Sequence, residues 1–472
     1  MGPVGTGIGG PAGGLVGDGS AVTTGSAGTG GASDGGVAVA GGGQTGAGNA
    51  GGRSVENAPG VTATELFVGV VYFPSSDEAI KAFGFEGATS GDQKAEAQII
   101  IDDINKRGGI LGRKVRPVFV SAQRSPGLTA DQQAAEICTE LTEDNNVFAV
   151  VNYGGVDSFK QCINKAGAVH VYENIADVGT ATYRRYPYYI QPGDLGFDRL
   201  ASAETPSLLR HKYFAPWNPD AGAPGTGAAK VGILTYDSPE ENNAVDRHLL
   251  PGLKAAGHRV DPANILRISD AASEMQGAVL KFKSNKVTHV IIFEQDGGLF
   301  VFFLQSADKQ QYRPRYGLQS GSGAQLFISL GAVPTSQLNG AVGFGWIPLL
   351  DISDASNPDD GPYSNSARRG CVTLMRSNNQ RLPDANAKRH AINLCDSLYL
   401  IERALKLAGG PSITRDSFLG GVHGLGTSFI NGQTFQTKLT PTQHDGVATV
   451  RQFTYQTKCT CMAYTSNPFP IP

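Results

Sequence analysis

Short apolar runs alternate with amphipathic stretches from residue 66 onward, and no other feature of the sequence restricts the fold as much. Runs with the length and branched side chains of buried strands cover residues 66–73, 115–120, 147–151 and 168–172. Helical patterns lie between them, over residues 92–107, 129–144 and 158–166, and Thr129 and Gln132 have the spacing of a capping box. Strands that alternate with helices form a parallel sheet. With a fifth strand over residues 186–191, this pattern predicts a first α/β lobe.

The pattern restarts after residue 230. Strands are predicted over residues 231–236, 287–293 and 314–318, and helices over 240–256, 273–284, 298–307 and 385–408. We expect Pro251 and Gly252 to interrupt the helix over 240–256. The tail over residues 429–464 is rich in Thr and Gln and is expected to form short strands. A body of about 410 residues is more than one core usually supports, so two packed lobes are predicted.

The first 60 residues differ in composition from the rest of the chain. They contain 23 glycines, no aromatic residue and four charged side chains, which is too little apolar material for a core. We therefore predict a disordered tether over residues 1–61. Such a leader is typical of an exported lipoprotein after removal of its signal peptide, so we expect an extracytoplasmic protein whose signal peptide and lipidated Cys precede Met1.

Several classes of function find no support in the sequence. A formal net charge of −3 and the lack of a Lys/Arg cluster argue against nucleic-acid binding. No apolar run approaches the roughly 20 residues of a membrane helix. The Gly5–Gly10 match to a dinucleotide fingerprint has no strand before it, and no Walker loop, G-x-S-x-G or H-E-x-x-H motif occurs. We predict no cofactor, no metal, no catalytic residue and no enzymatic activity, although a triad assembled from distant residues stays an alternative.

The chain has an even number of cysteines: Cys138, Cys162, Cys371, Cys395, Cys459 and Cys461. The first two fall in consecutive predicted helices on either side of one strand, where both can face the same side of a sheet. We predict disulfides between Cys138 and Cys162 and between Cys371 and Cys395. A zinc site is disfavoured because the close pair at 459 and 461 has no second CxxC or HxxxH nearby. Whether that pair is bonded stays open, and six buried thiols are the alternative.

Polar loops follow the predicted strands where a ligand would bind. In open α/β sheets, ligands bind beyond the carboxyl ends of the strands, where helix N-termini present free N–H groups. Loops of this kind lie at residues 152–158, 173–177, 236–237, 294–296 and 319–322. Glycines in the first of them let the backbone approach a bound molecule, and Asp157 or Ser158 begins the next helix. We predict a cleft between two lobes, with solvated loop charges as the alternative role of each carboxylate.

Three segments of the chain resemble a known family: residues 67–72, 91–115 and 150–155. The most specific is Asp-Ile-Asn-Lys-Arg-Gly-Gly-Ile-Leu-Gly at residues 103–112. It is similar to a segment of the type I periplasmic solute-binding proteins, the group that includes the leucine/isoleucine/valine-binding proteins. The resemblance extends from about residue 62 to the C-terminus. It implies two Rossmann-like lobes, a hinge that closes an interlobe cleft, and a membrane ABC transporter as partner.

The resemblance also implies ligand-binding residues. The family's carboxylate-holding loop falls on Tyr153, Gly154, Gly155, Asp157 and Ser158, and its next loop falls on Glu173, Asn174 and Ala176. In the second lobe the family's Tyr aligns with Asp296, and its amine-binding Glu aligns with Ser320, which cannot supply the charge. Glu173, Glu294 or Asp296 takes over that role, or the solute is not an ordinary aliphatic amino acid. The expected set is completed by Tyr72 and Tyr236.

The resulting hypothesis is a solute-binding protein. The expected parts are lobe 1 over residues 62–192, lobe 2 over 193–321, a return segment mainly in lobe 1 over 322–426, and C-terminal strands mainly in lobe 2 over 427–472. We expect a monomer that captures an amino acid, amide or related polar molecule and delivers it to the permease of an ABC importer. A sensor domain, a secreted enzyme and a surface adhesion protein are the alternatives.

Overall fold

The computed structural model describes residues 57–74, 89–125, 127–174 and 178–471 of the chain. Nearly all of the predicted Gly-rich tether, and Ala176 of the predicted ligand-binding residues, lie outside these ranges. None of the helices within the ranges is both long and apolar enough to cross a membrane.

The first lobe is built on a five-stranded parallel sheet. Its strands lie in the order β2-β1-β3-β4-β5, and all neighbours run parallel. They are β1 (Glu65–Tyr72), β2 (Lys114–Ser121), β3 (Ala149–Val151), β4 (Val169–Val171) and β5 (Tyr189–Ile190). The strands predicted for this lobe are thereby confirmed. The order reverses between β1 and β3, and such a switch point is where α/β sheets bind ligands at their carboxyl edge.

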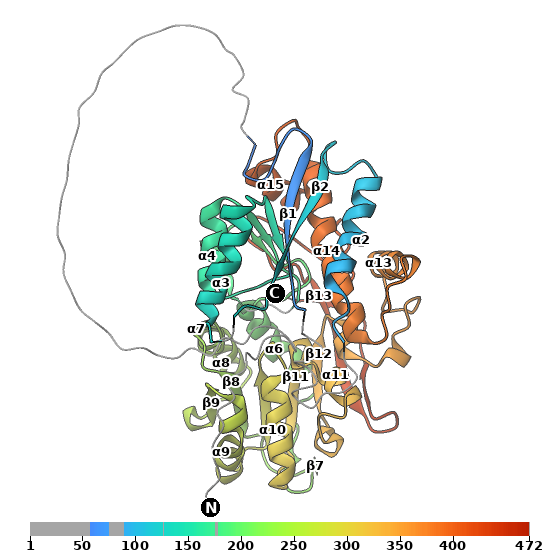
Figure 1. The fold of residues 1–472 in the computed structure, drawn as a ribbon. Coiled ribbons are helices and arrows are strands. Elements are labelled where there is room, and N and C mark those ends of the chain that lie inside the picture. Colours follow the sequence, from blue (N-terminus) through green and yellow to red (C-terminus); the bar gives the residue numbers. More distant parts are fainter. Residues whose placement is uncertain (1–56, 75–88, 126, 175–177, 472) are drawn as a thin grey trace, which may run out of the picture.

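Helices from distant parts of the chain cover this sheet. Figure 1 shows α3 and α4 on one side of it and α2 with α14 on the other. The helices are α2 (Gln93–Lys106), α3 (Ala130–Thr139) continued by η1 (Glu140–Asp144), α4 (Asp157–Ala166), α5 (Thr180–Arg185), α13 (Ser366–Ser377), α14 (Ala385–Ala408) and α15 (Arg415–Leu425). The capping box is confirmed, because Thr129 Oγ1 accepts from the Gln132 amide at 3.2 Å and the Gln132 side chain accepts from the Thr129 amide at 2.8 Å.

The second lobe has a larger mixed sheet, in the order β14-β13-β12-β11-β10-β8-β9 with β15 beside β13. The core strands are parallel and the C-terminal ones antiparallel. They are β8 (Val231–Tyr236), β9 (Ile265–Ile268), β10 (His289–Phe293), β11 (Arg315–Gln319), β12 (Val342–Gly345), β13 (Thr449–Gln456), β14 (Cys461–Tyr464) and β15 (Phe469–Pro470). A separate hairpin pairs β6 (Trp217–Asn218) with β7 (Ala223–Pro224).

The helices of the second lobe follow its strands closely. They are α6 (Phe197–Arg210), α7 (Pro239–Ala244), α8 (Leu250–Ala255), α9 (Ala271–Ser284), α10 (Gly298–Lys309), α11 (Ala324–Ser329) and α12 (Pro348–Asp351). Shorter turns are η2 (Val245–Leu249), η3 (Pro262–Asn264), η4 (Ser320–Ser322), η5 (Thr335–Leu338) and η6 (Asp354–Ser356). The α-helix predicted over residues 240–256 is interrupted as expected, but the interruption lies just before Pro251: the π-helical turn η2 separates α7 from α8. Pro251 stands in the first turn of α8, where its missing N–H costs little.

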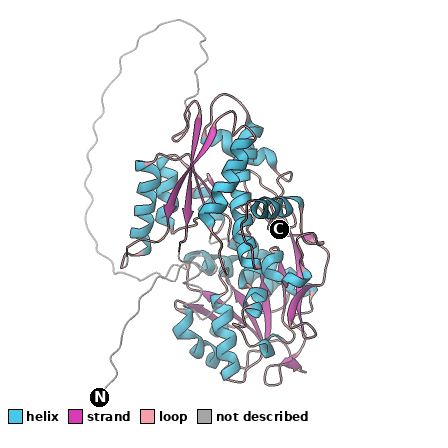
Figure 2. Cartoon of the chain, turned by 45° about the vertical axis from the view of Figure 1, so that its right-hand side comes forward, coloured by secondary structure: helices cyan, strands magenta, loops and turns pink. Residues whose placement is uncertain are grey.

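The chain crosses between the lobes three times. It passes from β5 to α6, from β12 to α13, and from α15 to β13, and Figure 2 shows the strands gathered into two separate groups. Two of the crossings pair with each other: Gln191 accepts from the Gly446 amide at 2.8 Å, and its own amide donates to the His444 carbonyl at 2.9 Å. Several backbone connections of this kind join two lobes at a hinge.

Both predicted disulfides are present. Cys138 and Cys162 join α3 to α4, and Cys371 and Cys395 join α13 to α14. The pairing left open by the sequence is also made, between Cys459 and Cys461 at the start of β14. No free cysteine is left in the described ranges.

Candidate functional site

The carboxyl edge of the first sheet brings together loops from three strands. Tyr72 ends β1, and its ring lies 5.6 Å from the Lys94 ammonium. The loop after β3 begins at Asn152, and its Tyr153 ring packs edge-on against Phe159 with centroids 4.8 Å apart. The loop after β4 carries the third group of predicted residues. The structure therefore places the first-lobe residues predicted from sequence on neighbouring loops.

Two glycines let the loop after β3 lie close to aromatic rings. A Cβ on Gly154 would stand 2.7 Å from the Tyr172 ring, and Gly155 has a φ of +64°. Positive φ values favour glycine because other residues have a Cβ that clashes with the backbone. These two glycines thus allow the loop after β3 to pack against the Tyr172 ring, which follows β4.

Asp157 and Ser158 contact neighbouring helices. Asp157 is the first residue of α4, after Val156, and its carboxylate lies 3.0 Å from both the Arg185 guanidinium and the Tyr186 hydroxyl. Ser158 donates to Asp131 of α3 at 2.7 Å. Both side chains therefore join α4 to its neighbours at the carboxyl edge.

Glu173 is turned into the protein. It is 1% exposed and accepts from the side chain of Asn431 in the third crossing. Burial, together with the nearby Asp396 and Asp194 carboxyls, raises the pKa of Glu173 well above its ordinary value. Burial likewise raises the pKa of Asp396 to about 7. Glu173 and Asp396 are thus two neighbouring buried carboxyls, and burial favours the neutral form of each.

Asn174 accepts a hydrogen bond from Arg389, a residue that the sequence analysis did not select. Arg389 lies near the start of α14 and is 1% exposed. Its other contacts are to the Asn386 side-chain oxygen at 3.1 Å and to His390 Nε2 at 3.2 Å. A signal for it was available in the sequence, because the polar residues 386, 389, 393 and 396 recur at helical spacing beside the apolar stripe of α14.

In the second lobe, Tyr236 and Asp296 form one pair. The Tyr236 hydroxyl donates to Asp296 at 3.1 Å, and Asp296 also accepts from the Gly298 amide at 2.9 Å. Burial raises the pKa of Asp296 and, with the Asp296 charge, that of Tyr236. Both side chains are partly buried at the carboxyl ends of β8 and β10.

The other two second-lobe residues are bonded internally. Glu294 is fully buried, and its carboxyl oxygens accept from the Leu299 and Phe300 amides at 2.8 and 2.9 Å, which stabilises the first turn of α10. Ser320 donates to Asp351 at 3.0 Å and accepts from the Trp346 amide at 2.8 Å. These contacts hold α10 and α12 in place and leave neither side chain directed to a ligand.

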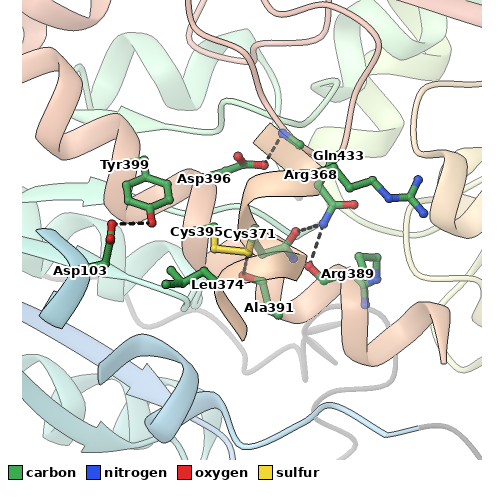
Figure 3. The surroundings of a disulfide bond; sticks show 12 residues. Asp103, Arg368, Cys371, Leu374, Arg389, Ala391, Cys395, Asp396, Tyr399 and Gln433 are labelled. Carbon is green, nitrogen blue, oxygen red and sulfur yellow. Dashed lines mark hydrogen bonds between the residues drawn. A yellow bond between two sulfur atoms is a disulfide. The ribbon is translucent and has the colours of Figure 1, made fainter. Parts of the chain in front are cut away.

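A pocket of about 410 Å³ lies between α13 and α14. None of the predicted ligand-binding residues lines it; it is bounded by the disulfide of Cys371, by Asp396 and Tyr399 and by Arg403 with Phe429. Figure 3 shows this region, where the Gln433 side chain donates to the Arg389 carbonyl at 2.7 Å. In the described ranges no group of three or more His, Cys, Asp or Glu side chains is arranged to hold a metal ion.

Comparison with known proteins extends the description of the fold. No protein-family model matches the sequence, and no match is found among the curated proteins. Solved structures do match over most of the chain. A fatty acid ABC transporter substrate-binding protein from Thermomonospora curvata superposes with a TM-score of 0.60 at 16% identity, over 89% of this chain and 96% of that one.

Two further solved structures agree with this result. An ABC transporter substrate-binding protein from Desulfitobacterium hafniense, in complex with Leu, has a TM-score of 0.56 at 13% identity, covering 85% of this chain and 100% of its own. A solute-binding protein from R. palustris, in complex with 4-hydroxybenzoate, has a TM-score of 0.60 at 13% identity, covering 86% and 97%. The chain therefore has the fold of the type I substrate-binding proteins of ABC transporters.

Proposed function

We propose that the protein captures a small organic solute between its two lobes, outside the cytoplasm, and delivers it to an ABC importer. The observation that carries this proposal is the match of 85–89% of this chain to ABC substrate-binding proteins, which covers 96–100% of the three chains named above. A fold alone does not determine function. The loops gathered at the carboxyl edge of the first sheet give the proposal a specific site.

The proposed mechanism is binding by closure. A solute docks on the first-lobe loops, and the second lobe rotates about the crossings until Tyr236 and Asp296 cover it. The Thr182 hydroxyl of α5 already donates to Glu240 of α7 at 2.7 Å, so the lobes touch beside the hinge. The closed form is the one that the permease recognises, and no bond in the solute is made or broken.

The class of solute is a separate part of the proposal. The three similar proteins are described with a fatty acid, with Leu and with 4-hydroxybenzoate, all of which carry a carboxylate. An amino acid or amide, as predicted from the sequence, stays a candidate. Glu294 and Ser320 are bonded internally, so among the predicted second-lobe residues Asp296 is the carboxylate that is only partly buried. A lipid anchor and a monomeric state also stay predictions.

The test is ligand binding by protein stripped through unfolding and refolding. Thermal shift is measured against amino acids, amides, aromatic acids, fatty acids, polyamines and sugars. A solute at 100 times its dissociation constant adds about 2.7 kcal/mol to the stability, which raises the melting temperature by several degrees. Small-angle scattering should show a smaller radius of gyration with the same solute. Binding without closure, or no binding across the panel, would overturn the proposal.

A further inference from the structure

The turn between β13 and β14 carries the most accessible sulfur of the protein. All six cysteines lie in the described ranges, and Cys459 is the exposed one among them. Its partner Cys461 is 5% exposed, while Cys138, Cys371 and Cys395 are each 2% exposed or less. Exchange of a disulfide requires a thiolate to reach one of its sulfur atoms. A thiolate in solution can reach Cys459, whereas both ends of the other two disulfides are wholly or partly buried.

The backbone of this turn is strained while the disulfide is closed. Thr460 is the one residue between the two cysteines, and its φ is +52°, in the left-handed region. A β-branched residue seldom adopts that conformation, because its Cβ and the branches on it crowd the backbone. Opening the disulfide frees Thr460 to take another conformation. Release of this strain favours reduction, and strained or exposed disulfides are the labile ones in proteins.

The charges along this part of the chain favour a thiolate. Lys458 directly precedes Cys459, and residues 446–472 contain two cationic side chains and no carboxylate. A neighbouring cation stabilises the thiolate form of a cysteine, which is both the attacking and the leaving form in disulfide exchange. The reduced pair is therefore suited to exchange in either direction.

The hairpin is held by contacts other than its disulfide. β14 pairs with β13 along its whole length. Met462 is 0% exposed, and its amide donates to the side-chain oxygen of Gln325 in α11 at 2.7 Å. These contacts stay in place when the bond between the cysteines opens. Both redox forms thus keep the fold of the second lobe, as a reversible exchange site requires.

We propose that Cys459 and Cys461 form a redox-active site, activated by the turn at Thr460, that oxidises thiols. A donor thiolate attacks the Cys459 sulfur, the S–S bond breaks, and its electron pair leaves with Cys461, which takes up a proton. A second donor thiolate then attacks the donor sulfur of the mixed disulfide, and Cys459 leaves and is protonated. Two thiols become one disulfide, and their two electrons reduce the protein. The donor is a small thiol or a dithiol protein, and the inference does not depend on the solute proposed above.

The first test equilibrates the native, full-length protein with mixtures of reduced and oxidised glutathione, and separately with reduced thioredoxin. Free thiols are then alkylated and counted by mass on the tryptic peptide that begins at Cys459. We expect two labels on this peptide at a reducing power at least tenfold weaker than either of the other disulfides needs, with one glutathione disulfide formed per protein. The two arms distinguish a small thiol from a dithiol protein as donor. If neither donor opens this bond before the other two, the inference is overturned.

The second test changes the turn without removing a cysteine. Asparagine tolerates the left-handed region better than threonine does. Thr460→Asn should therefore relieve the closed form, so that a several-fold greater reducing power is needed to open the bond. Thr457→Asn is the matched control, at an exposed position of the same turn outside the ring, and should leave the equilibrium unchanged. An unchanged or smaller requirement in Thr460→Asn, or equal shifts in both variants, would overturn the inference.

Discussion

At the scale of single residues, Gly155 determines how the loop after β3 reaches the candidate site. A Cβ at this position would lie 2.8 Å from the Tyr153 ring and 2.9 Å from Phe159, and the φ of +64° disfavours any other residue. The obstructing atoms belong to packed aromatic side chains, so they cannot move away as the end of a flexible side chain would. The position of Tyr153 at the carboxyl edge thus depends on this glycine.

We expect Gly155→Ala to lower the free energy of unfolding by about 1–3 kcal/mol, the cost of a non-glycine residue held at positive φ. Urea denaturation followed by circular dichroism measures the change. Gly277→Ala is the matched control, because Gly277 lies within α9 with no neighbour within 4 Å of the added Cβ. It should be stabilising by about 0.5–1 kcal/mol. Similar effects of the two substitutions would contradict the prediction.

The candidate site was predictable from the sequence in its loops but not in the direction of its side chains. Because Asn174 and Asp296 come just after two predicted strands, the sequence indicated their positions at the carboxyl edges of the sheets. It did not show that Ser320 is bonded to Asp351 and the Trp346 amide, since those partners are 31 and 26 residues away. Arg389 was missed for the opposite reason: an arginine in a helix usually extends into solvent, and only the tertiary fold buries this one.

At the scale of elements, helices and strands with a strong local sequence pattern were predicted well, and those with a weak pattern were not. α14 has the predicted bounds of residues 385–408, and β10 lies within the predicted run of residues 287–293. β12 was missed because glycine occupies two of its four positions, so its strand form depends on pairing with β11 and β13. α6 was missed as well; it contains Pro206, which normally argues against a helix interior.

The two long-range disulfides allow a matched prediction. Each closes a loop with a sequence separation of 24 residues, so each restricts the unfolded chain to the same extent. We expect the double variants Cys138→Ser with Cys162→Ser, and Cys371→Ser with Cys395→Ser, each to lose about 3 kcal/mol in the free energy of unfolding. Replacing Cys459 and Cys461, separated by 2 residues, should cost much less.

Urea denaturation of the three double variants checks this order. Alkylation followed by intact mass provides the control: no label is expected before reduction, and after reduction six labels in the unchanged protein and four in each double variant. The prediction would be contradicted if the variant without Cys459 and Cys461 lost as much free energy of unfolding as the other two variants.

At the scale of the whole molecule, several buried carboxyls lie where the lobes and the crossings meet. Glu173 and Asp396 join the loop after β4 to α14, and the Gly432 amide of the third crossing donates to Asp396 at 2.7 Å. In the second lobe, burial raises the pKa of Glu241 to about 8 and that of Asp351 to about 7. Proton binding by these groups therefore contributes to the stability of both lobes.

We expect the melting temperature to fall as the pH rises from 7 to 9. Burial raises the pKa of Glu96 to about 8, and its carboxyl oxygens have no hydrogen-bond partner within the described ranges. Above pH 7, unfolded carboxyls are fully ionised while Glu96 and Glu241 still hold protons in the folded state. The folded state thus binds more protons than the unfolded state, so stability is lost as the pH rises through the folded pKa values. The buried histidines, with lowered pKa values, titrate below this window.

Glu96→Gln separates this effect from other causes. The amide has nearly the shape of the protonated acid but cannot ionise in either state, so the variant should lack the part of the fall that Glu96 causes. Between pH 7 and 9 the unchanged protein should lose about 1.4 kcal/mol relative to the variant, with the loss levelling off above the folded pKa of about 8. Glu136→Gln, on the exposed face of α3, should leave the profile unchanged. Thermal melts at half-unit steps measure the three profiles, and a parallel fall in Glu96→Gln and the unchanged protein would show that Glu96 is already ionised in the folded state.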